Sequence, residues 1–268
     1  MTRKLFVFDI DSTLLPAGYS SIPVSTVSAI NTLLQEGHVV AINSGRPYGG
    51  IKRFLDAFCG GEKFAIAANG AALYDENGKV IEEETMPLSI LEYFKNRFLK
   101  KGRDVYAYST TNSLYLYGPT LSSWAKWEID ANAMSNYVDL NLTKLHSGTK
   151  ILKVMVCGPK EWIPIVPFSK EEREQYHIVI TGSEYLEILP HHVDKAEPIH
   201  SLCKLLNIDE NNVYCFGDSG NDIGMLKAYH GIAMGEGTLE AKNAAEFLTK
   251  PSYEEGIPFA LKEILKVI

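Results

Sequence analysis

Residues 5–15 read LFVFDIDSTLL, and this stretch decides the fold. Four apolar residues lead directly into Asp9 and Asp11, which stand one residue apart, and leucines follow. Because strand side chains alternate between two faces, both carboxylates would point to the same side of a strand that continued through them. Two carboxylates about 4 Å apart repel each other by about 1 to 4 kcal/mol. The pattern therefore indicates a cation at this point, or a carboxyl group that holds a proton.

Strand-like and helix-like patterns alternate after this stretch. Residues 23–37 predict a helix that begins near Pro23, ends before Gly37 and carries an apolar stripe of Val27, Ile30, Leu33 and Leu34. A strand (38–43), a second helix (48–58) and another apolar run (64–68) follow. This alternation predicts an α/β fold, a Rossmann-like parallel sheet with crossover helices.

The pattern changes from Ala71 onward. A hairpin is expected with its turn at Asn77 and Gly78. Beyond it, helices and strands are mixed in the manner of an α+β module: helices are expected within 90–102, 124–135 and 169–177, and strands within 104–118, 151–158 and 177–189. The alternation resumes with helices in 195–208, 221–231 and 239–249 and strands in 213–218 and 231–235. We therefore predict a core of residues 1–82 and 189–268, with an α+β cap domain inserted at 83–188.

Composition, net charge and cysteine spacing limit the classes of protein to which this chain could belong. The chain of 268 residues carries 26 basic and 33 acidic residues, a net charge of −7, which argues against binding to nucleic acid or to an anionic membrane. It has neither a signal peptide pattern nor an apolar run of about 20 residues, so we expect a cytoplasmic protein. Its four cysteines are scattered without metal-ligand spacing and are expected to be buried, reduced thiols: Cys59, Cys157, Cys203 and Cys215.

Polar residues follow three of the apolar runs, where a parallel sheet binds its ligands. They are Asp9 and Asp11 after LFVF, Ser44, Gly45 and Arg46 after VVAIN, and Gly217, Asp218, Asn221 and Asp222 after VYCF. Lys195 precedes the helix at which the sheet resumes. Clustered carboxylates favour Mg²⁺, while a serine, backbone N–H groups and a lysine can cradle a phosphate. Aspartate can act as the nucleophile in phosphoryl transfer, so we expect a small phosphorylated substrate.

These motifs carry a family resemblance. FDIDSTLL, NSGR, Lys195 and GDSGND resemble, in order, the four motifs of the haloacid dehalogenase (HAD) superfamily. The large insertion, GDSGNDIGML and GIAMG are similar to the Cof-type branch of sugar-phosphate and related phosphatases. The resemblance implies that Asp9 attacks phosphorus and ligates Mg²⁺. It also implies that Asp11 acts as the general acid and base, and lends its backbone carbonyl to the metal.

The resemblance assigns the other site residues too. Ser44 would bind the phosphoryl oxygens, Lys195 would neutralise the charge of Asp9 and phosphate, and Asn221 would hold the phosphate edge. Asp218 would be the second carboxylate on Mg²⁺, with Asp222 in support. The sequence departs from the family pattern at two positions where glycine is common, Ser12 and Ala196, and glycine permits backbone angles that serine and alanine adopt less easily.

Several alternatives stay open. Ser44 and Asp222 could cap helices, and Arg46 could contact substrate or form a structural ion pair. His191 and His192 lack a third ligand at motif spacing and are expected to lie in a loop. Six aromatic residues of the insertion are expected to pack in its core, although some could line a substrate pocket: Tyr106, Tyr108, Tyr115, Tyr117, Trp124 and Trp127.

Three other functions compete with a sugar-phosphate or related monoester phosphatase. Two belong to the same superfamily: a phosphomutase and a disaccharide-phosphate phosphatase. The third is a receiver-like signalling module, which also gathers acids and a lysine at strand ends. The general acid Asp11 and the large insertion disfavour that module.

Overall fold

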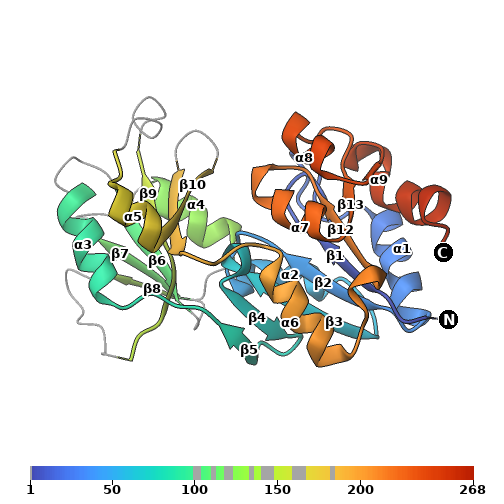
Figure 1. Cartoon of the computed structure of the whole chain (residues 1–268), viewed down its shortest axis with the longest axis horizontal. Coiled ribbons are helices and arrows are strands. Elements are labelled where there is room, and N and C mark those ends of the chain that lie inside the picture. Colours follow the sequence, from blue (N-terminus) through green and yellow to red (C-terminus); the bar gives the residue numbers. More distant parts are fainter. Residues whose placement is uncertain are drawn as a thin grey trace. The chain divides into compact units, whose positions relative to one another are not determined.

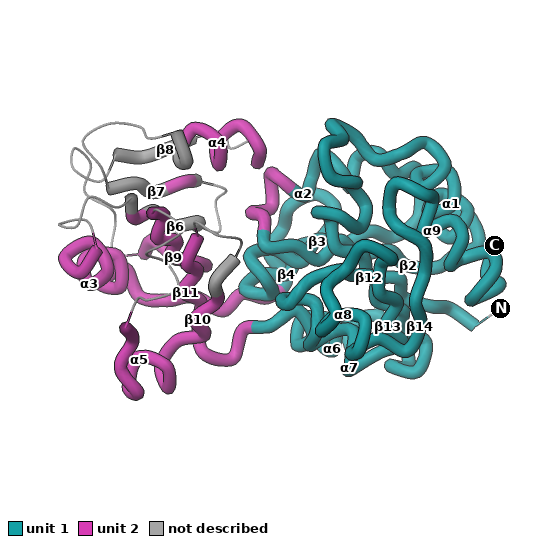
Figure 2. The backbone as a smooth tube through the Cα atoms, turned by 90° about the horizontal axis from the view of Figure 1, so that it is seen from above, with its two compact units in different colours: residues 1–45, 51–81, 194–268 teal, residues 46–50, 82–193 magenta. Residues whose placement is uncertain are grey.

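The computed structural model describes residues 2–98, 104–109, 113–117, 123–132, 136–139, 148–158, 167–181 and 185–268. Contacts divide the chain into two compact units (Figure 2). Unit 1 consists of Met1–Gly45, Ile51–Ile81 and Asp194–Ile268, and unit 2 consists of Arg46–Gly50 and Glu82–Val193. Unit 1 is therefore assembled from both ends of the chain, and most of unit 2 is one continuous insertion.

Unit 1 is built on a sheet with the strand order β14-β13-β12-β1-β2-β3-β4-β5 (Figure 1). Its strands are β1 (Leu5–Phe8), β2 (Val39–Asn43), β3 (Glu62–Ala67), β4 (Ala72–Asp75), β5 (Val80–Glu83), β12 (Val213–Gly217), β13 (His230–Ala233) and β14 (Phe247–Leu248). Neighbouring strands from β14 to β3 run parallel, and β4 runs antiparallel to β3. The predicted parallel sheet is confirmed.

The central strands are apolar because both faces of the sheet are covered. Every side chain of β1 and β2 is buried, as expected for parallel strands that carry helices on both sides. On one face, Leu5 and Val213 share a core with Ile199 and Leu202 of α6. The helices of unit 1 are α1 (Val24–Gln35), α2 (Tyr48–Leu55, which begins in unit 2), α6 (Glu197–Leu206), α7 (Ile223–Ala228), α8 (Leu239–Ala244) and α9 (Gly256–Phe259).

The local sequence of helix α1 explains which side of the helix is buried and where the helix ends. Its buried side includes Ile30, Leu33 and Leu34, three members of the predicted stripe. The helix ends where Gly37 adopts a φ of 84°, a left-handed conformation that glycine tolerates without steric cost. The backbone N–H of Gly37 donates to the carbonyl of Leu34, which satisfies one of the last carbonyls of the helix.

Unit 2 contains a second sheet, with the order β10-β11-β9-β6-β7-β8. All neighbouring pairs are antiparallel except β7 and β8. Helix α3 packs Ile90, Leu91 and Phe94 against Val154 and Ile188 of this sheet. The elements are α3 (Ser89–Phe98), β6 (Asp104–Ser109), β7 (Ser113–Tyr117), α4 (Ser123–Ala131), β8 (Asn136–Asp139), β9 (Ile151–Cys157), α5 (Lys170–Gln175), β10 (Tyr176–Thr181) and β11 (Tyr185–Pro190).

The structure differs from the sequence predictions in several details. The helix expected over 239–249 ends at Ala244, and Phe247–Leu248 instead form β14 at the sheet edge. β8 was not expected. Cys59 is exposed, because it follows the C-terminal end of α2 in a surface loop, whereas the other three cysteines are buried as predicted. Of the six aromatic side chains named above, only Trp127 lies among the described side chains; it is exposed and its ring lies near that of Tyr185.

No helix in the described part of the chain is long and apolar enough to cross a membrane.

Candidate functional site

The candidate site lies at the carboxyl ends of three adjacent parallel strands. β1 pairs with β12 on one side and with β2 on the other, so that Phe8 is level with both Phe216 and Ile42. The residues that follow these strands are therefore brought to one edge of the sheet. This edge is where open parallel sheets bind ligands.

A buried lysine joins two aspartates at this edge. Nζ of Lys195 lies 2.6 Å from Oδ1 of Asp9 and 2.6 Å from Oδ1 of Asp222. The lysine is 1% exposed and the two aspartates are 5% and 0% exposed, respectively. Burial lowers the pKa of Lys195, but the charges of Asp222 and Asp9 outweigh burial and raise it overall, so this lysine is a fixed positive charge.

Negative charge nevertheless exceeds positive charge here. Carboxylate oxygens of Asp9, Asp218 and Asp222 lie within 4.8 Å of one another, and the ammonium of Lys195 pairs with Asp9 and Asp222. Burial raises the pKa of Asp9 well above its usual range, and it raises the pKa of Asp218 to about 7, with further contributions from neighbouring carboxylates. A site that holds carboxylates against their own repulsion is suited to a cation with a preference for oxygen ligands, such as Mg²⁺.

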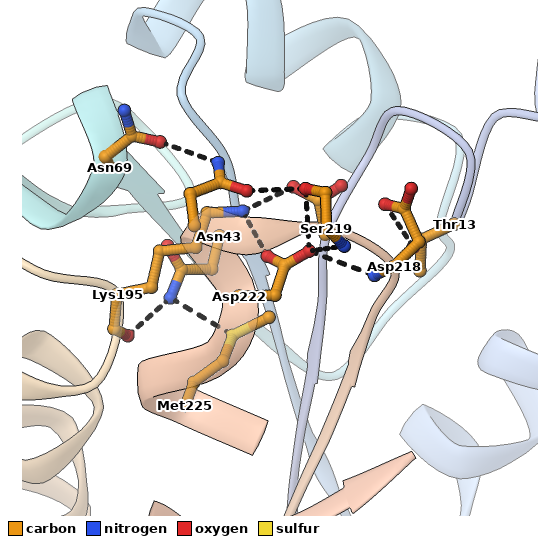
Figure 3. Close-up of polar contacts among 10 residues, drawn as sticks. Thr13, Asn43, Asn69, Lys195, Asp218, Ser219, Asp222 and Met225 are labelled. Carbon is orange, nitrogen blue, oxygen red and sulfur yellow. Dashed lines mark hydrogen bonds and ion pairs between the residues drawn. The ribbon is translucent and has the colours of Figure 1, made fainter. Parts of the chain in front are cut away.

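The three aspartates of this group, Asp9, Asp218 and Asp222, differ in how well they could ligate a metal ion. Oδ2 of Asp222 accepts the backbone N–H groups of Asp218 and Ser219, both at 3.0 Å, while its Oδ1 binds Lys195. Asp222 therefore holds its own loop and the lysine, and it completes a capping box with Ser219 at the turn Gly220–Asp222, whereas its side chain makes no capping bond to α7 (Figure 3). Asp9 and Asp218 are the carboxylates best placed to ligate an ion.

Asp11 does not join this cluster. β1 ends at Phe8, and the chain turns so that Asp9 is buried while the Asp11 side chain is exposed. The charge of Asp11 still raises the pKa of both Asp9 and Asp218, so it lies within electrostatic reach of each. The two aspartates that the sequence places side by side thus occupy different environments.

Of the two departures from the family pattern, only one falls where glycine matters. Ser12 has a φ of 59°, in the left-handed region, whereas Ala196 has ordinary right-handed helical angles. The left-handed region costs about 1 to 2 kcal/mol for a residue with a Cβ.

We expect Ser12→Gly to stabilise the protein by up to about 1 kcal/mol, because relief of this strain exceeds the entropy that glycine loses on folding. Urea unfolding measures the change. Ser28→Gly, at an exposed position inside α1, is the matched control and should destabilise by about 0.5 kcal/mol. Loss of stability in both variants would contradict the strain at Ser12.

Ser44 lies on the loop after β2 and is 1% exposed. Its backbone N–H donates to the carbonyl of Ile66, and its own carbonyl accepts the N–H of Asn69. The helix that follows begins at Tyr48, so Ser44 does not stand at its N-cap position, directly before the first helical residue.

Arg46, by contrast, groups with unit 2. Its Nη1 donates to the carbonyl of Ala131 at 2.8 Å and to Oδ1 of Asn132 at 3.4 Å, both at the end of α4. Both acceptors are neutral groups, so these contacts are structural hydrogen bonds, and the ion pair and the substrate contact considered for Arg46 both stay predictions. His191 and His192 are exposed in a turn after β11 and belong to no metal-ligand group in the described part of the chain.

Two asparagines at the site were missed in the sequence. Asn43, the last residue of β2, donates from Nδ2 to the carbonyl of Lys195 at 2.7 Å and so fixes the backbone of the lysine (Figure 3). Its Oδ1 is buried without a hydrogen-bond partner. Asn69 accepts a hydrogen bond from Nδ2 of Asn221 at 3.0 Å. The available signals were an asparagine at the end of an apolar run and another directly before a glycine.

Comparisons with known proteins identify the family of the chain. A family model described as haloacid dehalogenase-like hydrolase matches residues 6–261. YxeH of Bacillus subtilis (strain 168), a provisionally named phosphatase, is 28% identical over 98% of both chains. The 5-amino-6-(5-phospho-D-ribitylamino)uracil phosphatase YwtE of the same organism is 24% identical, again over 98% of both chains.

Solved structures share the fold. That of a haloacid dehalogenase-like hydrolase from Bacteroides thetaiotaomicron superposes with a TM-score of 0.83 at 21% identity, over 98% of this chain and 100% of the other. The HAD subclass IIB sugar phosphatase BT4131 gives 0.78 at 23% identity, over 98% and 100%. The chain therefore belongs to the haloacid dehalogenase-like hydrolases, in the Cof-type branch of that superfamily, and is a hydrolase of phosphoric monoesters.

Proposed function

We propose that the chain is a Mg²⁺-dependent phosphatase that hydrolyses a small phosphorylated metabolite, a sugar phosphate or a related monoester, through an aspartyl phosphate on Asp9. The observation that carries this proposal is the buried group of Asp9, Lys195 and Asp222 beside Asp218. It combines a carboxylate nucleophile, a fixed positive charge and an oxygen-ligand pair for a metal at one point.

The first half-reaction forms a bond between an oxygen of Asp9 and phosphorus, and it breaks the bond between phosphorus and the alcohol oxygen. Asp11 donates a proton to that oxygen, so the product leaves as a neutral alcohol. Lys195 orients the attacking carboxylate and offsets its charge. Mg²⁺ held by Asp9, Asp218 and the backbone carbonyl of Asp11, with Asp222 in support, would supply further positive charge toward the phosphoryl oxygens.

The second half-reaction reverses the roles. Asp11, now a carboxylate, takes a proton from water while the water oxygen attacks phosphorus, and the bond to Asp9 breaks. Inorganic phosphate leaves and both aspartates return to their starting state. Ser44, the backbone N–H of Gly45 and the amide of Asn221 would hold the phosphoryl oxygens through both steps.

The proposed substrate class draws on the relatives. YwtE and BT4131 are named for small phosphorylated compounds, a ribitylaminouracil phosphate and sugar phosphates. The net charge of −7 gives no general attraction for nucleic acid. We further propose that the inserted residues 83–188 act as a cap that selects the alcohol part of the substrate.

A panel of phosphorylated metabolites with Mg²⁺ tests the proposal, with Asp9→Asn as the blank. We expect release of inorganic phosphate from at least one sugar phosphate or related monoester, and none from the blank. Turnover that persists in full after exhaustive chelation would overturn the metal assignment. Positional isomers in place of free phosphate would identify a mutase instead.

The acidity of Asp218 leads to a pH prediction for metal binding. A carboxyl with a pKa of about 7 holds its proton below that pH, and a metal must displace it. We expect Mg²⁺ affinity to fall about tenfold between about pH 8 and about pH 6, with proton release on binding. Calorimetric titration in two buffers of different ionisation enthalpy measures both.

The control for this titration is Asp218→Asn, which removes one of the two ligand carboxyls whose pKa is raised, so proton release on Mg²⁺ addition should fall and the remainder should come from Asp9. Equal affinity at both pH values, with no protons released by the unmodified chain, would show that this carboxyl does not meet the metal.

A further inference from the structure

Residues 68–70, which read ANG, form an unusual turn directly after β3. Ala68, Asn69 and Gly70 have φ values of 51°, 58° and 106°, all in the left-handed region. Glycine is required at position 70, because a Cβ there would lie 1.9 Å from the carbonyl oxygen of Asp194. Strained residues cost about 1 to 3 kcal/mol each and persist only where surrounding contacts hold them. The contacts that hold residues 68–70 in this conformation therefore indicate what role the turn has.

The turn touches the loop that carries Ser44. The backbone N–H of Asn69 donates to the carbonyl of Ser44 at 3.0 Å. The Asn69 side chain also lies over Gly45, so closely that a Cβ at position 45 would be 2.9 Å from Oδ1 of Asn69. Asn69 is itself 6% exposed. The Asn69 side chain thus packs directly against Gly45 and limits the positions that the Ser44–Gly45 backbone can adopt.

The same side chain orients Asn221. Oδ1 of Asn69 accepts from Nδ2 of Asn221 at 3.0 Å, and Oδ1 of Asn221 accepts from Oγ of Ser219 at 2.6 Å. In this arrangement Oδ1 of Asn221 faces the hydroxyl of Ser219, and Nδ2 faces the carbonyl oxygen of the Asn69 amide. An amide nitrogen carries two hydrogens, and Asn69 takes only one. The other is left for a phosphoryl oxygen.

The turn also reaches the segment that carries the lysine, since Gly70 packs against the carbonyl of Asp194, directly before Lys195. One three-residue turn therefore contacts three loops that come from distant parts of the sequence and that each deliver a group to the candidate site. All of these residues lie in unit 1.

From these contacts we infer that Asn69 is a positioning residue for the phosphoryl group, its side chain acting through Asn221, while its backbone N–H, which any residue at this position supplies, holds the carbonyl of Ser44. The inference rests on the proposed phosphatase function and extends it to a residue outside the four motifs. Asparagine suits the position twice over. It tolerates the left-handed backbone better than other residues with a Cβ, and it supplies the acceptor that Asn221 needs.

The variant Asn69→Gly separates these two properties. Glycine adopts a left-handed backbone at no steric cost, so the turn should form and thermal stability should be kept. The acceptor for Asn221 is lost. With p-nitrophenyl phosphate and Mg²⁺ we expect kcat/KM to fall about 10- to 100-fold, the usual range for loss of a hydrogen bond to a charged group, here the bond from Asn221 to the phosphoryl oxygens. Inhibition by inorganic phosphate should weaken in parallel.

A double-mutant cycle shows whether the effect runs through Asn221. Asn221→Ala should lower kcat/KM by a similar factor, and the double variant should be little worse than Asn221→Ala alone. Asn207→Gly is the matched control, because Asn207 is also left-handed, with a φ of 53°, but is exposed at the end of α6. It should leave the kinetics unchanged.

Two results would overturn the inference while leaving the proposed function intact: wild-type kinetics in Asn69→Gly, or losses that multiply fully in the double variant. If Asn69→Gly does not fold, Asn69→Asp decides, since aspartate keeps the acceptor and tolerates the same backbone. Asn221→Ala should then cost as much in the Asn69→Asp background as in the wild type, and a cost that vanishes there would refute the positioning role. A wild-type chain that hydrolyses no ester with Mg²⁺ would overturn the proposed function and this inference together.

Discussion

Asp9→Asn is expected to reduce turnover of any phosphate ester by roughly 10⁴-fold or more, the scale of loss when a nucleophile is removed. The amide has the size of the carboxylate but cannot form the acyl phosphate on which the proposed mechanism depends. The fold should survive, because Asp222 still pairs with Lys195 at 2.6 Å after the charge of Asp9 is removed. Steady-state phosphate release measures the loss, and mass spectrometry after acid quenching should find no phosphoryl adduct.

The control for this variant is Asp56→Asn. Asp56 is exposed after the end of α2, where it pairs with Lys52 one helical turn away, and surface pairs of this kind contribute little. Its kinetics should match those of the wild type. A phosphorylated peptide recovered from Asp9→Asn, or turnover within tenfold of wild type, would transfer the role of nucleophile to another residue.

The parallel sheet with its crossover helices could be predicted because apolar strands and amphipathic helices carry strong periodic signals. LFVF, VVAIN and VYCF are buried runs of the kind that parallel strands require, and their pairing as β1, β2 and β12 brings together the polar residues that follow them. The meeting of Asp9, Asp218, Asp222 and Lys195 follows from that topology. Sequence order and strand polarity were enough to anticipate it.

Features that depend on contacts between distant parts of the chain could not be predicted from local sequence patterns. Asn69 acts through a backbone conformation and a side-chain contact with a loop 152 residues away, and neither has a local pattern beyond the Asn-Gly pair. The grouping of Arg46 with unit 2 depends on where the end of α4 lies. β14 was read as part of a helix because a two-residue edge strand is too short to show a period of its own.

The environments of Asp9 and Asp11 are the most informative difference between the sequence prediction and the structure. The sequence suggested that Asp9 and Asp11 would share one spot, held together by a cation or a proton. The structure instead ends β1 before them, buries Asp9 beside Lys195 and leaves Asp11 exposed. Exposure gives Asp11 access to solvent protons, which a residue that alternates between acid and base needs.

Asp11→Asn should therefore have an effect that depends on the leaving group. For a sugar phosphate, whose alcohol leaves poorly, both half-reactions need proton transfer, and each should slow by about 10²- to 10⁴-fold. For p-nitrophenyl phosphate, the phenolate leaves without help, so only hydrolysis of the aspartyl phosphate should slow. Rapid-mixing experiments should then show a burst of nitrophenol, close to one per enzyme, followed by slow turnover.

The adduct that accumulates gives the second readout, because mass spectrometry of the quenched Asp11→Asn enzyme should place a phosphoryl group on the peptide that contains Asp9. The double variant Asp9→Asn, Asp11→Asn is the matched control and should give neither burst nor adduct. Unimpaired turnover of p-nitrophenyl phosphate by Asp11→Asn, without a burst, would mean that water is activated by a different group. Equal slowing for both classes of substrate, again without an adduct, would mean that Asp11 serves to shape the loop before Ser12 and transfers no proton.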